Sequence, residues 1–152
     1  MKILLKFIFI FFIFINFSKA DLIKPNITLK PFDILMIQLN SLKNNNVPFK
    51  DAGIEQTWVF AHPNYKRMTS PLEKFKKMIY GKSYEMLIGH ENNEIVVLNE
   101  TNNRSVYKVY ILSKEKKYYY IWQIEKVRQE GNLKNCWMTT SVSSPEYLGD
   151  VI

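Results

Sequence analysis

The sequence predicts an α+β fold, in which three N-terminal helices pack on a curved, four-stranded antiparallel sheet to form a cone. Up to about residue 87, apolar residues recur at spacings of three and four, which is the period of a helix. After residue 93 the period changes to two, which is typical of strands. The short gaps between the predicted strands favour antiparallel pairing of consecutive strands. Because the helical stripes and the aromatic face of the sheet must both be buried, we expect the sheet to wrap over the helices.

Two helices are expected before residue 63. The first covers residues 32–45, because an apolar stripe recurs there at Leu35, Leu39 and Leu42. The second begins at Asp51, whose side chain can cap it. It ends at His62, because the residue before a proline is pushed out of the helical region.

The third expected helix has the clearest start signal. Ser70 and Glu73 have the spacing of a capping box, and Pro71 between them suits the first helical position. The serine oxygen could accept a free backbone N–H, and the glutamate could reach back to the cap. Gly81 ends this helix.

Four strands are expected after residue 93, at residues 94–98, 104–112, 117–128 and 133–142. The third strand is rich in aromatic residues. One of its faces carries Tyr118, Tyr120, Trp122 and Ile124, and the other carries Tyr119, Ile121, Gln123 and Glu125. We expect the first face to lie inside, in one cluster with Trp58 and Phe75. His62 or Tyr65 should then lie near the mouth of the cone.

Residues 1–20 have the pattern of a cleavable signal peptide. A basic start is followed by an unbroken run of Phe and Ile over residues 7–15, and the segment ends in Ser18-x-Ala20. A membrane-spanning helix needs about 20 apolar residues, so an uncleaved anchor is the less favoured alternative.

The remaining chain divides into an extended lead-in at 21–31, a single domain at 32–142 and a loosely held tail at 143–152. We expect the protein to be exported to a periplasm or to the extracellular space, with no membrane-spanning segment after cleavage.

Charge and cysteine content exclude some classes of function. The 21 basic and 14 acidic residues give a net charge of +7, which falls to +4 without the three lysines of residues 1–20. This is mildly basic, and the lysines are scattered, so no nucleic-acid partner is expected.

Cys136 is the only cysteine, so no internal disulfide can form. We interpret it as a small buried strand residue; pairing between two chains and a nucleophilic role are the alternatives.

Several segments resemble an uncharacterised family of bacterial and plant proteins, domain-of-unknown-function family 4864. They are Phe60–Leu72, Phe75, Met78, Tyr84, Leu87, the opening helix at Ile37–Leu42, and Asn135–Thr139. The resemblance covers about Ile34 to Val142 and implies the cone-shaped fold of nuclear transport factor 2. It implies no established activity. The family has serine where this chain has His62 and glycine where it has Ser70, so the resemblance assigns no role to His62.

Enzymes with the cone fold that this resemblance implies use acidic, histidine or tyrosine side chains in the cavity. The candidates here are Glu55, His62, Tyr65, His90, Tyr119, Gln123 and Glu125. His62 could act as a general base, because imidazole titrates near neutral pH. The alternative is a helix-end histidine that interacts with the helix dipole. His90 lies in a polar loop and is expected to be solvated. No spacing typical of a metal site or of a cofactor motif occurs, so neither a metal nor a cofactor is expected.

The aromatic stripe is the stronger functional feature. We expect the ligand-binding residues Trp58, Tyr65, Phe75, Tyr120 and Trp122, which could stack on a flat apolar molecule. The alternative is that these rings only pack against the helices. The favoured hypothesis is a non-catalytic exported domain that binds a small apolar molecule or a protein partner through its cone. The second is a cavity-based lyase, isomerase or hydrolase with His62 as general base. A homodimer joined through the outer sheet face is a further hypothesis.

The first testable prediction is that the mature chain begins at Asp21. Cleavage after Ala20 follows from the small-x-small ending of the leader. N-terminal sequencing of protein recovered from outside the cytoplasm measures this directly. Met1 at that terminus would contradict the prediction.

Overall fold

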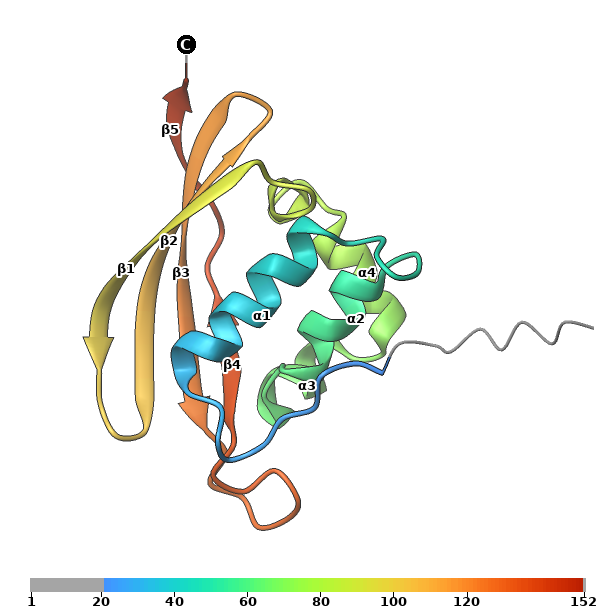
Figure 1. Cartoon of the computed structure of the whole chain (residues 1–152), viewed down its shortest axis with the longest axis vertical. Coiled ribbons are helices and arrows are strands. Elements are labelled where there is room, and N and C mark those ends of the chain that lie inside the picture. The colour runs from blue at the N-terminus through green and yellow to red at the C-terminus, as the bar shows by residue number, and fades with distance from the viewer. Residues whose placement is uncertain (1–20, 152) are drawn as a thin grey trace, which may run out of the picture.

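A computed structural model describes residues 21–151, so the predicted signal peptide at residues 1–20 lies outside the described part. Within it the fold is α+β, with a helical layer on one face of a curved antiparallel sheet (Figure 1). The helices are α1 (Pro31–Lys43), α2 (Ala52–Val59), α3 (Pro63–Thr69), α4 (Leu72–Ile79) and the short 3₁₀ helix η1 (Glu85–Leu87). The strands are β1 (Asn92–Glu100), β2 (Arg104–Ser113), β3 (Lys116–Lys126), β4 (Trp137–Val142) and β5 (Glu146–Asp150). In this described range no helix is both long enough and apolar enough to cross a membrane.

Strand β3 is the centre of the sheet. It pairs with β2 over Lys116–Glu125, and β1 pairs with β2 at one edge. On its other side β3 pairs with β4 over Trp122–Lys126 and with β5 over Lys116–Tyr119. The sequence predicts a loosely held tail at residues 143–152, but β5 extends this edge of the sheet. The ring of Tyr147 lies 5.5 Å from that of Tyr118, which helps to hold the strand.

The helical layer differs from the prediction in one helix and in two caps. Helix α3 is not predicted by the sequence. It begins at Pro63, whose fixed φ suits the first helical position. Ser70 ends α3 instead of capping α4, and its backbone N–H donates to the carbonyl of Lys66 at 2.8 Å. The predicted capping box is therefore wrong: α4 has no side-chain cap, and Glu73 lies 3.7 Å from Lys76.

Asp51 does not cap α2 through its side chain. Its carboxylate instead accepts a short hydrogen bond from the hydroxyl of Tyr80 and lies 3.6 Å from the ammonium of Lys76. The bond from Tyr80 is the main reason why the pKa of Asp51 lies below its ordinary value. This cluster joins the start of α2 to the end of α4.

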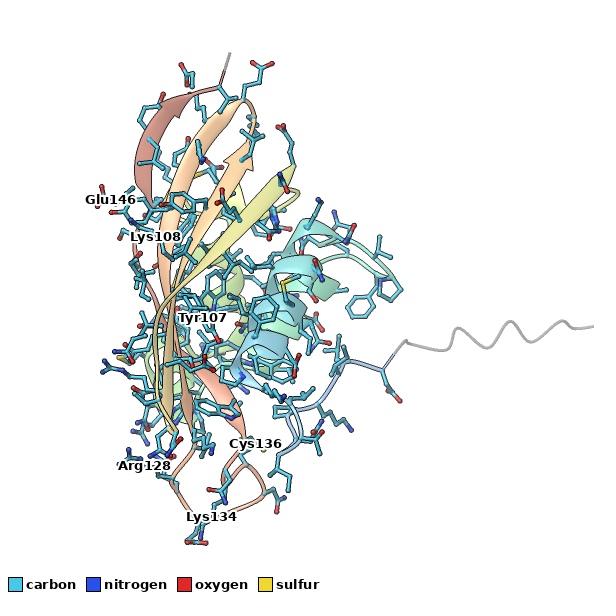
Figure 2. All side chains as sticks on the ribbon, turned by 60° about the vertical axis from the view of Figure 1, so that its left-hand side comes forward. Tyr107, Lys108, Arg128, Lys134, Cys136 and Glu146 are labelled. Atoms are coloured by element: carbon cyan, nitrogen blue, oxygen red, sulfur yellow. The ribbon has the colours of Figure 1, made fainter. Side chains whose placement is uncertain are left out.

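The core lies between the helical layer and the inner face of the sheet. The predicted orientation of β3 is confirmed, because Tyr120, Trp122 and Ile124 are buried while Tyr119 and Ile121 are half-buried on the outer face. The neighbouring β2 alternates in the same way. In Figure 2, Tyr107 lies on the helical side, near Phe32, and Lys108 lies on the outer side.

Trp122→Ala should lower the free energy of unfolding by about 3–5 kcal/mol, because it removes the largest fully buried side chain of the sheet. Urea unfolding measures this. Tyr119→Ala is the matched control, since it truncates an aromatic residue on the outer face of the same strand and should cost clearly less. A loss below about 1 kcal/mol for Trp122→Ala would contradict this account of the core.

Candidate functional site

The predicted ligand-binding rings meet around a very small cavity. Tyr65, Phe75 and Trp122 line it, and its volume is about 20 Å³. Space of about 10–15 Å³ on this measure holds one water molecule. Trp58 and Tyr120 belong to the same apolar cluster but do not line the cavity. The structure therefore brings the predicted residues together mainly as packed core rings.

Ring contacts fill the space that a ligand would need. The Trp58 and Phe75 centroids lie 5.0 Å apart, and the Tyr65 ring meets Phe75 edge-on at 6.5 Å. The Tyr120 hydroxyl donates to the carbonyl of Ser83 at 3.0 Å. Burial raises the pKa of Tyr65 to about 12 and also raises the pKa of Tyr120. Both hydroxyls are therefore protonated at neutral pH and cannot serve as bases there.

A buried polar network crosses the core beside this cavity, and the sequence does not predict it. The Gln38 amide on α1 donates to the carbonyl of Thr57 at 3.1 Å. Its Oε1 accepts from the Trp122 indole at 3.1 Å and from the Thr139 hydroxyl at 2.6 Å. The available signal was a polar residue beside the apolar stripe of the first predicted helix. A buried amide of this kind needs partners on neighbouring elements.

His62 is separated from this cavity and caps α3. The backbone N–H of Asn64 donates to its Nδ1 at 3.1 Å, and its own backbone N–H donates to Thr139 at 2.8 Å. Because Nδ1 accepts this hydrogen bond, the neutral ring carries its own proton on Nε2. Burial lowers the pKa of His62; Glu125 opposes that shift and Arg67 adds to it. His62 is expected from the sequence to interact with the dipole at the C-terminus of the second predicted helix. It instead caps the N-terminus of α3.

His62 lines a polar groove of about 620 Å³ that the sequence does not predict. The groove lies where the β1–β2 turn, the end of β3 and the start of α3 meet. Its lining consists of His62, Asn64, Thr101, Asn103, Arg104, Glu125, Lys126, Arg128 and Gln129. A signal was present in the sequence, because antiparallel pairing sets Arg104 at the start of one strand opposite Glu125 near the end of the next.

His90 is buried, although the sequence predicts it to be solvated. Its Nδ1 lies 2.8 Å from the carbonyl of Leu87, and Asn93 contacts its Nε2 at 3.0 Å. Its loop is held against α1, since the N–H of Gly89 donates to Leu42 at 3.0 Å. Burial lowers the pKa of His90. Both ring nitrogens are occupied, so this histidine is structural.

The remaining candidates do not form one site. Glu55 pairs with Lys76 at 3.2 Å in the helical layer. Tyr119 and Gln123 lie instead on the outer face of β3. Cys136 is buried, as predicted, and burial raises the pKa of its thiol. Within residues 21–151 no group of three His, Cys, Asp or Glu residues could hold a metal ion.

No protein-family model, curated protein or solved structure matches this chain.

The two histidines should make the free energy of unfolding fall as the pH drops below about 6.5. Burial lowers the pKa of both rings from the ordinary value of 6.5. Above that pH both imidazole rings are neutral in the folded and in the unfolded state. Below it the histidines of the unfolded chain bind protons, whereas the same rings in the folded protein stay neutral, so unfolding is favoured. Urea unfolding from about pH 7.5 to about pH 5 measures the effect.

His62→Asn is the control for this pH dependence. Asparagine is a preferred N-cap residue, can accept from Asn64, and does not titrate. The variant should therefore lose stability less steeply than the wild type over the same range. The lowered pKa of Asp51 matters only near and below its ordinary value of 3.8, outside this window. Equal slopes for variant and wild type would contradict the role of His62.

Proposed function

We propose that this chain is an exported, non-catalytic binding domain that engages a protein through the outer face of its sheet. The first candidate partner is a second copy of the same chain. The observation that carries the proposal is the one-sided architecture: the described helices all cover the inner face, and the tyrosine-bearing outer face lacks a helical cover (Figure 1).

The outer face has the composition of a protein interface. Tyr110 and Tyr119 are cross-strand neighbours with ring centroids 6.1 Å apart. The Lys108 ammonium lies 4.2 Å from the Tyr119 ring centroid, and the Lys117 ammonium lies 5.1 Å from that of Tyr110. These contacts hold the rings in place before any partner binds. Tyrosine is enriched at interfaces because it buries much area with few rotatable bonds.

The charges of this face favour a second copy as partner. Strand register sets Glu94 beside Tyr110 and Glu146 beside Tyr119, so that acidic side chains flank the tyrosine pair. Lys108 lies on the same outer side as Glu146 (Figure 2). A surface that carries both signs can match itself across a two-fold axis, where each residue contacts a different residue of the partner.

Binding of a small apolar molecule in the cone is less well supported. Ligand pockets commonly measure about 300–1,000 Å³, whereas the cavity between Tyr65, Phe75 and Trp122 measures about 20 Å³. An apolar ligand would have to displace these rings.

A catalytic role for His62 has one favourable feature, a lowered pKa that keeps the ring neutral. General-base catalysis needs an unprotonated nitrogen that faces the substrate. Nδ1 is occupied by the Asn64 N–H, and Nε2 carries the proton. A lyase, isomerase or hydrolase would therefore require the cap of α3 to open.

Export and the nuclear transport factor 2-like cone belong to the same proposal. Export is supported by the basic, apolar and small-residue segments of the leader. The cone is supported by the order of helices before a curved antiparallel sheet, together with the resemblance between Ile34 and Val142.

The test is native mass spectrometry of residues 21–152 at about 10 μM, which reports oligomeric state and bound ligand together. Wild type should be a dimer, and Ile121→Glu should be a monomer, because the new carboxylate would be buried at the centre of the interface. Met68→Glu is the matched control, since Met68 is 65% exposed on α3 and should leave the dimer intact.

A monomeric wild type that carries no other mass would overturn the second copy as partner. A monomer with a bound small molecule would instead support the cavity hypothesis. Dissociation by Met68→Glu as well as by Ile121→Glu would show that the outer face is not the interface.

A further inference from the structure

The polar groove beside His62 is distinct from the outer-face tyrosines and from the core cavity. Its volume of about 620 Å³ is within the range of small-molecule sites. Three segments that are remote in sequence form it: the β1–β2 turn, the end of β3 with the residues after it, and the start of α3. In Figure 2, Arg128 lies just beyond the end of β3.

Three cations of this groove have no anionic partner. Arg104, Lys126 and Arg128 line it, and none of them forms an ion pair with any residue in the described range 21–151. The only partner of the Lys126 ammonium in the described range is the ring of Trp137, whose centroid lies 5.1 Å away and which carries no negative charge. Glu125 is the only carboxylate in the lining. The groove therefore carries a net charge of about +2 with its histidine neutral.

Glu125 does not neutralise these cations. It faces Arg104 in the strand register, yet the two form no ion pair, and its Oε1 accepts from the amide of Gln123 at 3.0 Å. The guanidinium groups of Arg104 and Arg128 are thus free to donate paired hydrogen bonds. Such paired donors match the oxygens of carboxylates and phosphates.

Neutral donors complete the groove. His62 is 95% buried, since its exposed fraction is 5%, and within residues 21–151 its Nε2–H has no acceptor. The Oδ1 of Asn64 accepts from Arg67 at 2.8 Å and from Gln129 at 3.1 Å. Because this oxygen is occupied, the Asn64 amide nitrogen remains as a donor. His62 itself is fixed by its bond from the Asn64 N–H, so its Nε2–H is held in one direction.

We propose that this groove binds a small oxyanion with two or more negative charges, held by Arg104 and Arg128 and oriented by the Nε2–H of His62. This site goes beyond the proposed protein interface and does not depend on it. Phosphate esters and polycarboxylates share the required chemistry. The size of the groove fits a small molecule, and the mildly basic chain does not carry the extended charge of a nucleic-acid surface.

The test is a titration of residues 21–152 with pyrophosphate and, separately, with citrate, at low ionic strength and about pH 7.5. The chain has two histidines, so nuclear magnetic resonance can follow both imidazole rings. The ring signal of His62 should shift and saturate, whereas that of the buried His90 should not move. Sodium chloride at equal ionic strength should cause no saturable shift.

Variants then locate the site. Arg104→Gln combined with Arg128→Gln should weaken binding at least tenfold. Lys24→Gln combined with Lys77→Gln removes the same charge from exposed positions outside the groove and should leave the affinity within about twofold of wild type. All four side chains are exposed, and near-ultraviolet circular dichroism checks that each variant keeps its tertiary structure.

A response to pyrophosphate alone would identify a phosphate site, and a response to citrate alone would identify a carboxylate site. A response to both would show that charge and spacing set the affinity. The proposal is overturned if neither anion gives a saturable shift, if His90 shifts as much as His62, or if the lysine variant loses as much affinity as the arginine variant.

Discussion

The fold depends on the hydrogen bonds of one buried amide, that of Gln38. This residue lies on α1, yet it bonds to the end of α2 and to two strands, through Thr57, Trp122 and Thr139. Removal of one member would leave the others buried without partners, which costs about 1–3 kcal/mol for each group. Apolar packing alone would allow α1 to slide over the sheet. The amide fixes where along the sheet the helix lies.

Thr139 extends this constraint to His62. Its backbone exchanges hydrogen bonds with residues 60 and 62, so that the segment between α2 and α3 runs beside β4 as an isolated bridge. The same residue therefore bonds to Gln38 through its side chain and to His62 through its backbone. The position of the His62 ring over the polar groove is thus determined from inside the core.

The sequence predicts the α+β class, the orientation of β3 and the burial of Cys136, because these follow from local periodicity and composition. It does not predict α3, since the seven residues from Pro63 to Thr69 have no apolar stripe. The capping box at Ser70 failed because a helix already ended there, and local spacing cannot show that. The groove of Arg104 and Arg128 depends on three segments that only the tertiary fold brings together.

The interrupted edge formed by β4 and β5 limits how two sheets of this kind could join. The edge changes strand between Val142 and Glu146, and the hydroxyl of Ser143 takes the place of a carbonyl by accepting from the N–H of Ile121 at 2.8 Å. The opposite edge, β1, has a register shift between Val97 and Asn99. The β4–β5 edge therefore offers a foreign strand no long regular row of free backbone groups, which is one way in which sheet proteins avoid edge-to-edge aggregation. The exposed Val96, Val97 and Leu98 lie on β1, so any pairing of two sheets edge to edge would occur at that edge.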